Sequence, residues 1–157
     1  MTYKKLERVP QVSQKLDTYT HAVKVDPRVY RHVRGDDVWI EVSLDKQTLY
    51  VRQGDQITAA YRVSTGRPGS PRRKSMATRK GVYKMYALYK RYPMWGRDWY
   101  CLDVPYAMFY HGEFAIHGAY WHNSFGTPVS HGCVNMVPDD AGEVYQQVKK
   151  GTCVWVH

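Results

Sequence analysis

The chain has 157 residues, of which 43% are hydrophobic, and a formal net charge of +9. This length suits one domain that buries about two-thirds of its unfolded surface, and the hydrophobic content excludes an intrinsically disordered protein. The charge predicts attraction to anionic surfaces, whether nucleic acid, wall polymer or lipid headgroup. Three cysteines exclude a dense disulfide scaffold and leave at least one thiol unpaired.

No stretch reaches the length of about 18 apolar residues that a membrane-spanning segment needs. The first 14 residues carry the positive charge of a secretory signal peptide but lack its apolar core. We therefore expect no transmembrane segment, and either an intracellular protein or one whose export signal is not present in this chain.

The first part of the chain, residues 1–36, is charged, is interrupted by Pro10 and Pro27, and shows no sustained periodicity. We predict an N-terminal extension over residues 1–36, with one short helix near 12–19. A regular pattern begins directly afterwards and continues to the end, so the second predicted unit is 37–157.

This second unit alternates apolar and polar residues from its start, which is the pattern of a half-buried strand. The predicted strands cover 38–44, 48–52, 56–64, 81–89, 102–109, 114–116 and 152–156. Short turns join the first three strands into a meander, and a basic loop over 67–80 follows them.

One helix is predicted near the C-terminus, where residues 137–151 read VPDDAGEVYQQVKKG. Asp139 or Asp140 can cap its start, and two lysines precede Gly151 at its end. The predicted fold class is mainly β, a sandwich or meander with one C-terminal helix beside the loop that carries the candidate site.

Residues 115–136 read AIHGAYWHNSFGTPVSHGCVNM and hold three of the seven histidines and one of the three cysteines. A nucleophilic cysteine needs a neighbouring imidazolium or backbone N–H groups that lower the pKa of its thiol. Gly132 permits a tight turn that aims the amides of Gly132 and Cys133 at a developing oxyanion. His117 and His131 are both candidates for the general base.

Three interpretations of this segment compete: structural residues, a metal site, or Cys–His acyl transfer. A metal site would draw on four residues, His117, His122, His131 and Cys133. Their separations of 5, 9 and 2 residues match neither of the usual paired zinc motifs. The flanking glycines favour acyl transfer, because backbone must approach a substrate carbonyl closely. We expect no metal and no cofactor.

The motif IHG at 116–118, followed by SHGCVNM at 130–136, resembles the L,D-transpeptidase catalytic domain, the YkuD family. The resemblance extends from Val38 to Val156 and implies an L,D-transpeptidase-like fold. One departure lies at 78–81, where relatives commonly show Thr-Pro-x-Gly and this chain lacks the proline. The departure bears on the conformation of that loop rather than on the chemistry.

The resemblance implies an enzyme that is acylated by a peptidoglycan tetrapeptide stem, releases D-alanine, and passes the acyl group to an amine in a 3→3 cross-link. Cys133 would be the nucleophile and His117 the general base and acid, with Gly118 orienting His117 through its carbonyl. The amides of Gly132 and Cys133 would form the oxyanion hole. Three further residues would shape or brace the site: Ser130, His131 and Asn135.

Nine aromatic residues lie between Tyr86 and Tyr110. Among them Tyr92, Trp95 and Trp99 do not alternate, and they fall in a connection longer than a hairpin needs. We predict a lid over Cys133, as similar enzymes of the family have. Such a lid would contact the stem peptide and exclude water from the acyl-enzyme.

Several expectations concern partners and the remaining residues. Cys101 and Cys153 are expected to be buried free thiols rather than a disulfide. The basic loop is either solvated or holds an anionic wall polymer or the stem's carboxylates. The resemblance implies stem peptides as substrates, carbapenem-type β-lactams as inhibitors and a place in the cell envelope. We expect a monomer and no nucleic-acid partner.

Two alternative functions stay open. A cell-wall carboxypeptidase or hydrolase would use the same acyl-enzyme and differ only in its acceptor. A non-catalytic module would instead bind an anionic polymer through its positive charge, with Cys133 incidental.

Overall fold

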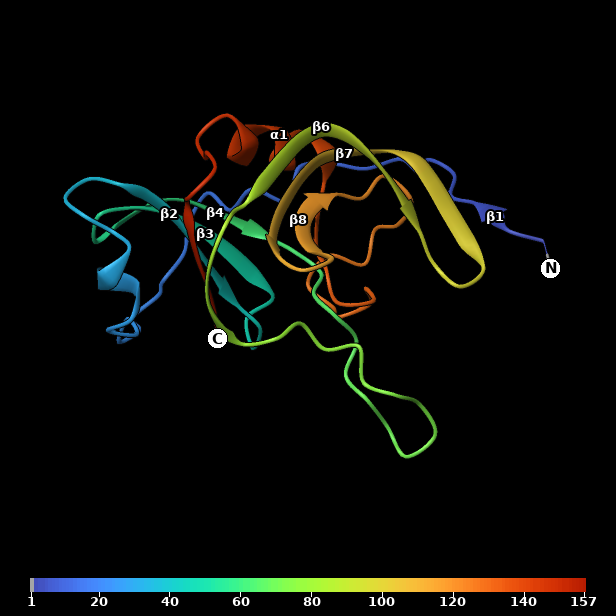
Figure 1. Cartoon of the computed structure of the whole chain (residues 1–157), viewed down its shortest axis with the longest axis horizontal. Coiled ribbons are helices and arrows are strands. Elements are labelled where there is room, and N and C mark those ends of the chain that lie inside the picture. The colour runs from blue at the N-terminus through green and yellow to red at the C-terminus, as the bar shows by residue number, and fades with distance from the viewer. Residues whose placement is uncertain (1) are drawn as a thin grey trace.

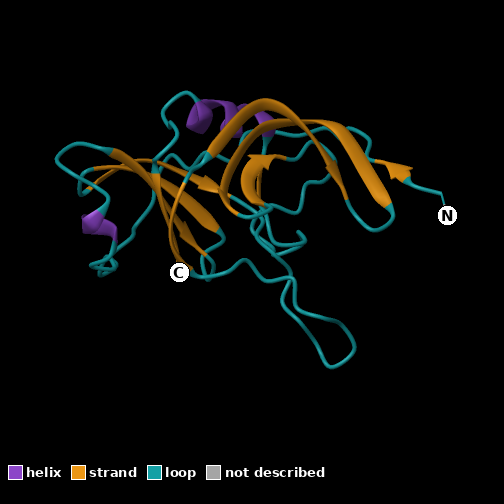
Figure 2. Ribbon diagram, in the orientation of Figure 1, coloured by secondary structure: helices purple, strands orange, loops and turns teal. Residues whose placement is uncertain are grey.

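The computed structural model describes residues 2–157, which form two five-stranded sheets and one α-helix (Figure 1; Figure 2). The first sheet has the order β4-β3-β2-β10-β5, formed by Gln56–Arg62, Thr48–Gln53, Val38–Ser43, Cys153–Val156 and Gly81–Lys84. The second contains β1 (Lys4–Lys5), β6 (Ala87–Trp95), β7 (Trp99–His111), β8 (Phe114–Gly118) and β9 (Val134–Met136). Helix α1 spans Pro138–Tyr145, and a 3-10 turn, η1, spans Val29–Arg31.

The predicted fold class, mainly β with one C-terminal helix, is confirmed. A single hydrophobic core joins the sheets, with Ile40 and Leu49 from the first and Met108 and Ile116 from the second. Within residues 2–157, no helix is both long and apolar enough to cross a membrane.

Strand β2 is buried on both faces, although its alternation predicts one solvated face. Ile40 and Val42 point into the shared core, while Trp39 packs on the opposite side against Val29 and Trp155. The second face is covered because the segment before the domain folds back over it.

Glu41 lies fully buried on this covered face and receives three hydrogen bonds. Its Oε2 accepts from Arg52 Nε at 2.6 Å, and its Oε1 lies 2.5 Å from His21 Nε2 and 2.8 Å from His157 Nε2. Burial alone would raise the pKa of Glu41, but the hydrogen bonds from His157, His21 and Arg52 outweigh it and lower the pKa to about 2. The carboxylate therefore ties together the extension, two strands and the end of β10.

The short helix predicted near 12–19 is wrong. This stretch is extended and runs beside β4, where Leu16 N donates to Ala60 O at 2.8 Å and Arg62 N donates to Gln14 O at 3.0 Å. Its backbone finds partners in the sheet rather than within a helical turn.

The predicted helix limits also need correction. Val137 occupies the N-cap of α1 rather than Asp139 or Asp140, and the helix ends at Tyr145, before the two lysines. Asp140 is occupied elsewhere, since its carboxylate accepts hydrogen bonds from Ser13 Oγ at 2.5 Å and Gln14 N at 2.7 Å.

The strand predicted over 81–89 is two strands in different sheets. Met85 and Tyr86 separate β5 from β6, so the chain crosses from the first sheet to the second at this point. The long connection predicted to hold Tyr92, Trp95 and Trp99 is likewise mostly strand, because β6 and β7 form one long hairpin with its turn between Trp95 and Trp99.

The substitution Glu41→Gln should lower the free energy of unfolding at pH 7 by about 3–5 kcal/mol, because it leaves the buried Arg52 guanidinium without its carboxylate. The folded-state pKa of Glu41 is depressed, so its contribution is present above about pH 4.5 and is lost as pH falls toward 2. Denaturant unfolding of both proteins at pH 7 and pH 3 measures the difference.

Asp26→Asn is the matched control, since it removes an exposed ion pair with Arg28. It should leave the unfolding midpoint close to that of the wild type. Equal losses in the two variants, or a Glu41→Gln deficit that does not shrink at low pH, would contradict the assignment.

Candidate active site

The site is built where β8 and β9 lie side by side as parallel strands. The pairing sets His117 opposite Asn135 and Ile116 opposite Val134, so the residue that precedes β9, Cys133, comes beside β8. His117 and Cys133 both line one cavity of about 660 Å³. Eight of the ten predicted site residues line this cavity: Cys133, His117, Ser130, His131, Asn135, Tyr92, Trp95 and Trp99.

His117 is nearly inaccessible, and its ring orientation is fixed. Its Nδ1 lies 2.9 Å from the carbonyl oxygen of Gly118, which can only accept, so Nδ1 carries the proton and Nε2 a lone pair. Burial lowers the pKa of His117 to about 4. At neutral pH the imidazole is therefore uncharged and can accept a proton at Nε2.

Gly118 sits where no side chain fits. A Cβ at this position would lie 2.7 Å from Pro105 Cγ and 3.0 Å from Pro138 Cα. The glycine thus allows β8 to approach the start of α1, and its carbonyl oxygen is the hydrogen-bond partner of His117 Nδ1.

The turn before Cys133 needs glycine on two counts. Gly132 has a φ of +130°, and a Cβ there would lie 2.4 Å from the ring of Phe114. Thr78 Oγ1 donates to Gly132 O at 2.8 Å and accepts from Gly66 N at 2.8 Å. The threonine at the base of the basic loop therefore anchors the turn without the family's proline.

The Ser130 side chain forms two hydrogen bonds within the same turn. Its hydroxyl donates to the carbonyl of Cys133 and lies 3.2 Å from Gly132 N, whose proton it accepts. The Gly132 amide, which is predicted to bind an oxyanion, thus donates a long hydrogen bond to Ser130 in the free protein. To bind a substrate oxygen, the amide would have to give up that bond.

The Cys133 thiol is protonated at neutral pH. Burial raises its pKa to about 11, and the Glu113 carboxylate adds to this effect while the amide of Ala115 opposes it. The sequence-based expectation of a lowered thiol pKa is therefore wrong for the free protein. Cys133 Sγ lies 3.8 Å from the carbonyl oxygen of Glu113. The thiol and the His117 imidazole are thus two uncharged groups that line the same cavity.

His122 connects the loop after β8 to Asn135 of β9. His122 Nδ1 accepts from Ser124 N at 3.0 Å, and its Nε2 lies 3.1 Å from the side-chain amide of Asn135. His131 instead faces the hairpin, where its ring stacks on Trp99 with centroids 6.0 Å apart.

Residues 2–157 contain one group of three side chains whose ligand atoms could reach a common metal, and it lies outside this cavity: His21, Glu41 and His157. Lys46 Nζ lies 3.0 Å from His21 Nδ1 and can only donate, so that nitrogen is an acceptor. A metal-bound imidazole would present an N–H there and would need an acceptor instead. The group is therefore a hydrogen-bonded cluster around Glu41.

The β6–β7 hairpin forms the aromatic wall of the cavity and carries Tyr92, Trp95 and Trp99. Its alternation is hidden in the sequence because the register of β6 shifts between Tyr92 and Met94, at Pro93, which has no N–H to donate. The connection is therefore a hairpin with a tight turn, not the long loop predicted.

The cavity lining carries little formal charge. Glu113 is the only Asp, Glu, Lys or Arg among the described residues that line it. Leu6, from the N-terminal extension, is a lining residue that no sequence pattern marked. Cys101 and Cys153 are buried free thiols, as predicted.

The family model of the L,D-transpeptidase catalytic domain, YkuD, matches residues 37–156. The chain belongs to this family. A candidate L,D-transpeptidase of Bacillus subtilis, YciB, is 26% identical over 98% of this chain and 82% of its own length. An L,D-transpeptidase structure from Mycobacterium smegmatis has a TM-score of 0.67 at 25% identity, over 77% of this chain and 58% of that chain.

A solved L,D-transpeptidase in complex with imipenem also has a TM-score of 0.67 at 25% identity, over 78% of this chain and 60% of that chain. The chain thus spans less than two-thirds of each of these two solved structures. The resemblance carried by the two glycine motifs is confirmed, and the protein has the fold of this enzyme family.

Alkylation of Cys133 by iodoacetamide should accelerate about tenfold per pH unit from pH 6 to pH 9 without a plateau, because the thiol pKa is about 11. Intact-mass kinetics with peptide mapping measure the rate. Cys133→Ala is the control and should take up no label at this peptide. A plateau below pH 8 would show a preformed thiolate and contradict the raised pKa of the thiol.

Proposed function

We propose that this L,D-transpeptidase domain acts on peptidoglycan stem peptides, with Cys133 as nucleophile and His117 as general base and acid. The observation that carries the proposal is the β8–β9 pairing, which places a buried imidazole with a free Nε2 in the same cavity as a partly exposed thiol. The proposed location is the cell envelope, where such stems occur.

In the first half-reaction, Sγ of Cys133 attacks the carbonyl carbon of the L,D-peptide bond while His117 Nε2 takes the thiol proton. The carbonyl oxygen becomes an oxyanion that the amides of Gly132 and Cys133 stabilise. The carbon–nitrogen bond then breaks, His117 returns the proton to the leaving amine, and D-alanine departs from a thioester on Cys133.

In the second half-reaction, an amine of another stem attacks the thioester carbonyl and passes its proton to His117. The carbon–sulfur bond breaks, and the thiol of Cys133 regains its proton from the imidazole. The product is a 3→3 cross-link. Because burial keeps both groups uncharged in the free protein, the cycle starts and ends with neither Cys133 nor His117 carrying a charge.

Incubation with a disaccharide-tetrapeptide, followed by mass spectrometry, should show release of D-alanine and a thioester adduct on Cys133. His117→Ala should slow acylation by about 10²–10⁴-fold, the usual contribution of a positioned general base. His131→Ala should cost less, because its ring stacks on Trp99 rather than meeting the thiol.

Cys133→Ala should abolish the adduct, and a carbapenem should likewise acylate Cys133 alone. Chelators should change neither rate. A reversed order of the two histidine variants, with both folded, would contradict the choice of base. Retention of full function by Cys133→Ala would favour the non-catalytic binding module.

The hairpin wall bears on the choice between transfer and hydrolysis, since it covers the cavity with aromatic side chains. Replacing Trp95 and Trp99 together by alanine should raise KM for the tetrapeptide donor and increase the hydrolysed fraction of product, because water reaches the acyl-enzyme more freely. Product ratios from the same mass-spectrometric assay measure this.

Alkylation by iodoacetamide is the internal control and should barely change in the double variant. Wild-type kinetics and product ratio in that variant would remove the lid role from the hairpin. A wild-type protein that yields only hydrolysed product would identify the domain as a carboxypeptidase.

A further inference from the structure

We propose that residues 3–9, here called the strap, are a working part of the substrate cavity: they hold the tip of the β6–β7 hairpin over Cys133, and Leu6 forms part of the wall that meets the donor stem. The strap lies outside the 37–156 family match. The inference rests on the proposed function of the cavity.

The first step of the argument concerns the edge of β7. β6 pairs with one edge of β7 along most of its length, and β8 pairs with the other edge only between Met108 and His111. The far end of that second edge, around Trp99 and Tyr100, is taken by β1 in parallel register. The strap therefore occupies a strand edge that the hairpin would otherwise leave open.

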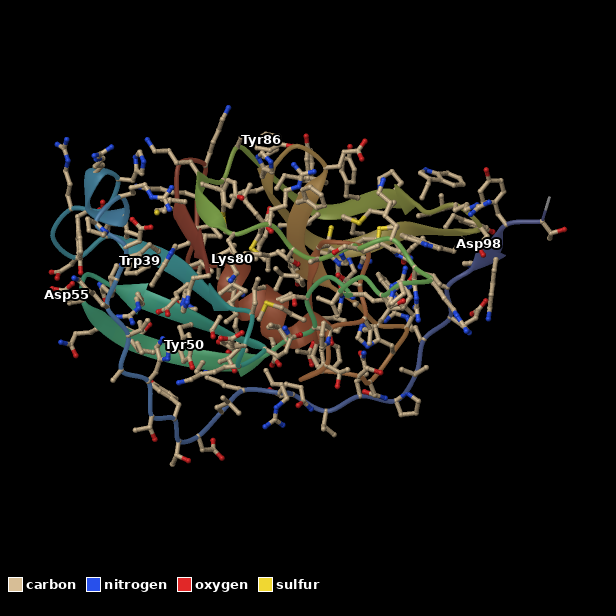
Figure 3. All side chains as sticks on the ribbon, turned by 90° about the horizontal axis from the view of Figure 1, so that it is seen from below. Trp39, Tyr50, Asp55, Lys80, Tyr86 and Asp98 are labelled. Atoms are coloured by element: carbon tan, nitrogen blue, oxygen red, sulfur yellow. The ribbon has the colours of Figure 1, made fainter. Side chains whose placement is uncertain are left out.

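Backbone hydrogen bonds fix this contact at both ends of the strap. Lys4 N donates to Asp98 O at 2.9 Å, Leu6 N donates to Tyr100 O at 3.1 Å, and Val9 N donates to Tyr120 O at 2.9 Å. In Figure 3 the N-terminal strand runs beside the labelled Asp98. The strap thus connects the hairpin tip to the loop that follows β8.

Side chains reinforce the same connection. Leu6 packs into a cluster with Met94 and Trp99 of the hairpin and Trp121 of the loop, and it lines the cavity. Tyr3 meets the ring of Trp95 edge-on with centroids 6.3 Å apart. Each aromatic residue proposed to cover Cys133 from the hairpin tip therefore has a contact with the strap.

The energetic reason follows from the shape of the hairpin, which extends well past β8 (Figure 1). A two-stranded hairpin in water is marginally stable, whereas a third strand gives it independent support. With the strap in place the tip is three-stranded, so Trp95 and Trp99 are held ready before the substrate binds.

Lys4→Pro in the full chain is the direct test, because it removes the N–H that bonds Asp98 while Lys4→Ala keeps it. Relative to Lys4→Ala, the proline variant should show faster hydrogen exchange over 94–101. It should also show a KM for the tetrapeptide donor raised about fivefold, the size expected for one backbone hydrogen bond. Alkylation of Cys133 should be equal in the two variants.

Leu6→Ala tests the contribution of Leu6 to the cavity wall separately from the backbone support of the hairpin tip. It should raise the donor KM while increasing exchange over 94–101 less than Lys4→Pro does, because the backbone hydrogen bonds of the strap remain. Equal exchange and equal KM in Lys4→Pro and Lys4→Ala would overturn the proposal, as would a proline variant whose alkylation slows to the same extent as its acylation. If the wild type releases no D-alanine, the proposed function fails. In that case, hydrogen exchange over 94–101 and acylation of Cys133 by a carbapenem, compared between Lys4→Pro and Lys4→Ala, still test whether the strap supports the hairpin tip.

Discussion

The parallel pairing of β8 with β9 is the constraint on which the rest of the site depends. Two parallel neighbours cannot be joined by a tight turn, so the chain must leave the sheet after Gly118 and return before Val134. The segment between these two residues forms part of the cavity wall and contains the turn before Cys133. A shift of register by one residue would turn His117 to the opposite face of β8 and remove its imidazole from the cavity.

Burial determines the charge states of Cys133 and His117. A thiolate and an imidazolium in an apolar cavity would both need compensating partners, and the described lining offers no cationic side chain. The protein instead keeps Cys133 and His117 neutral, with pKa values displaced in opposite directions by the same cause. Burial disfavours the charged form of each group, so it raises the pKa of an acid such as the thiol and lowers the pKa of a base such as the imidazole.

Local pattern was enough to predict strands β2, β3, β4 and β10 of the first sheet and the motif around Cys133, because alternation and glycine placement are encoded over a few residues. It failed where a distant partner decides the outcome. Asp140 looks like a helix cap, but Ser13 claims its carboxylate from the other end of the chain. The hairpin was hidden because Pro93 shifts the register, and Leu6 joins the cavity only through tertiary contact. The thiol pKa depends on burial, which no spacing of residues displays.

The positive charge of the protein lies outside the cavity, so salt should affect binding at the surface and binding in the cavity differently. The protein carries +9, yet no lysine or arginine among the described residues lines the cavity. Forces between exposed charges fade over about 8 Å at physiological ionic strength, while contacts inside an apolar cavity are screened far less. Added salt should therefore weaken any binding of an anionic polymer to the charged surface and leave the proposed reaction at Cys133 nearly unchanged, so a salt titration can distinguish surface binding from catalysis.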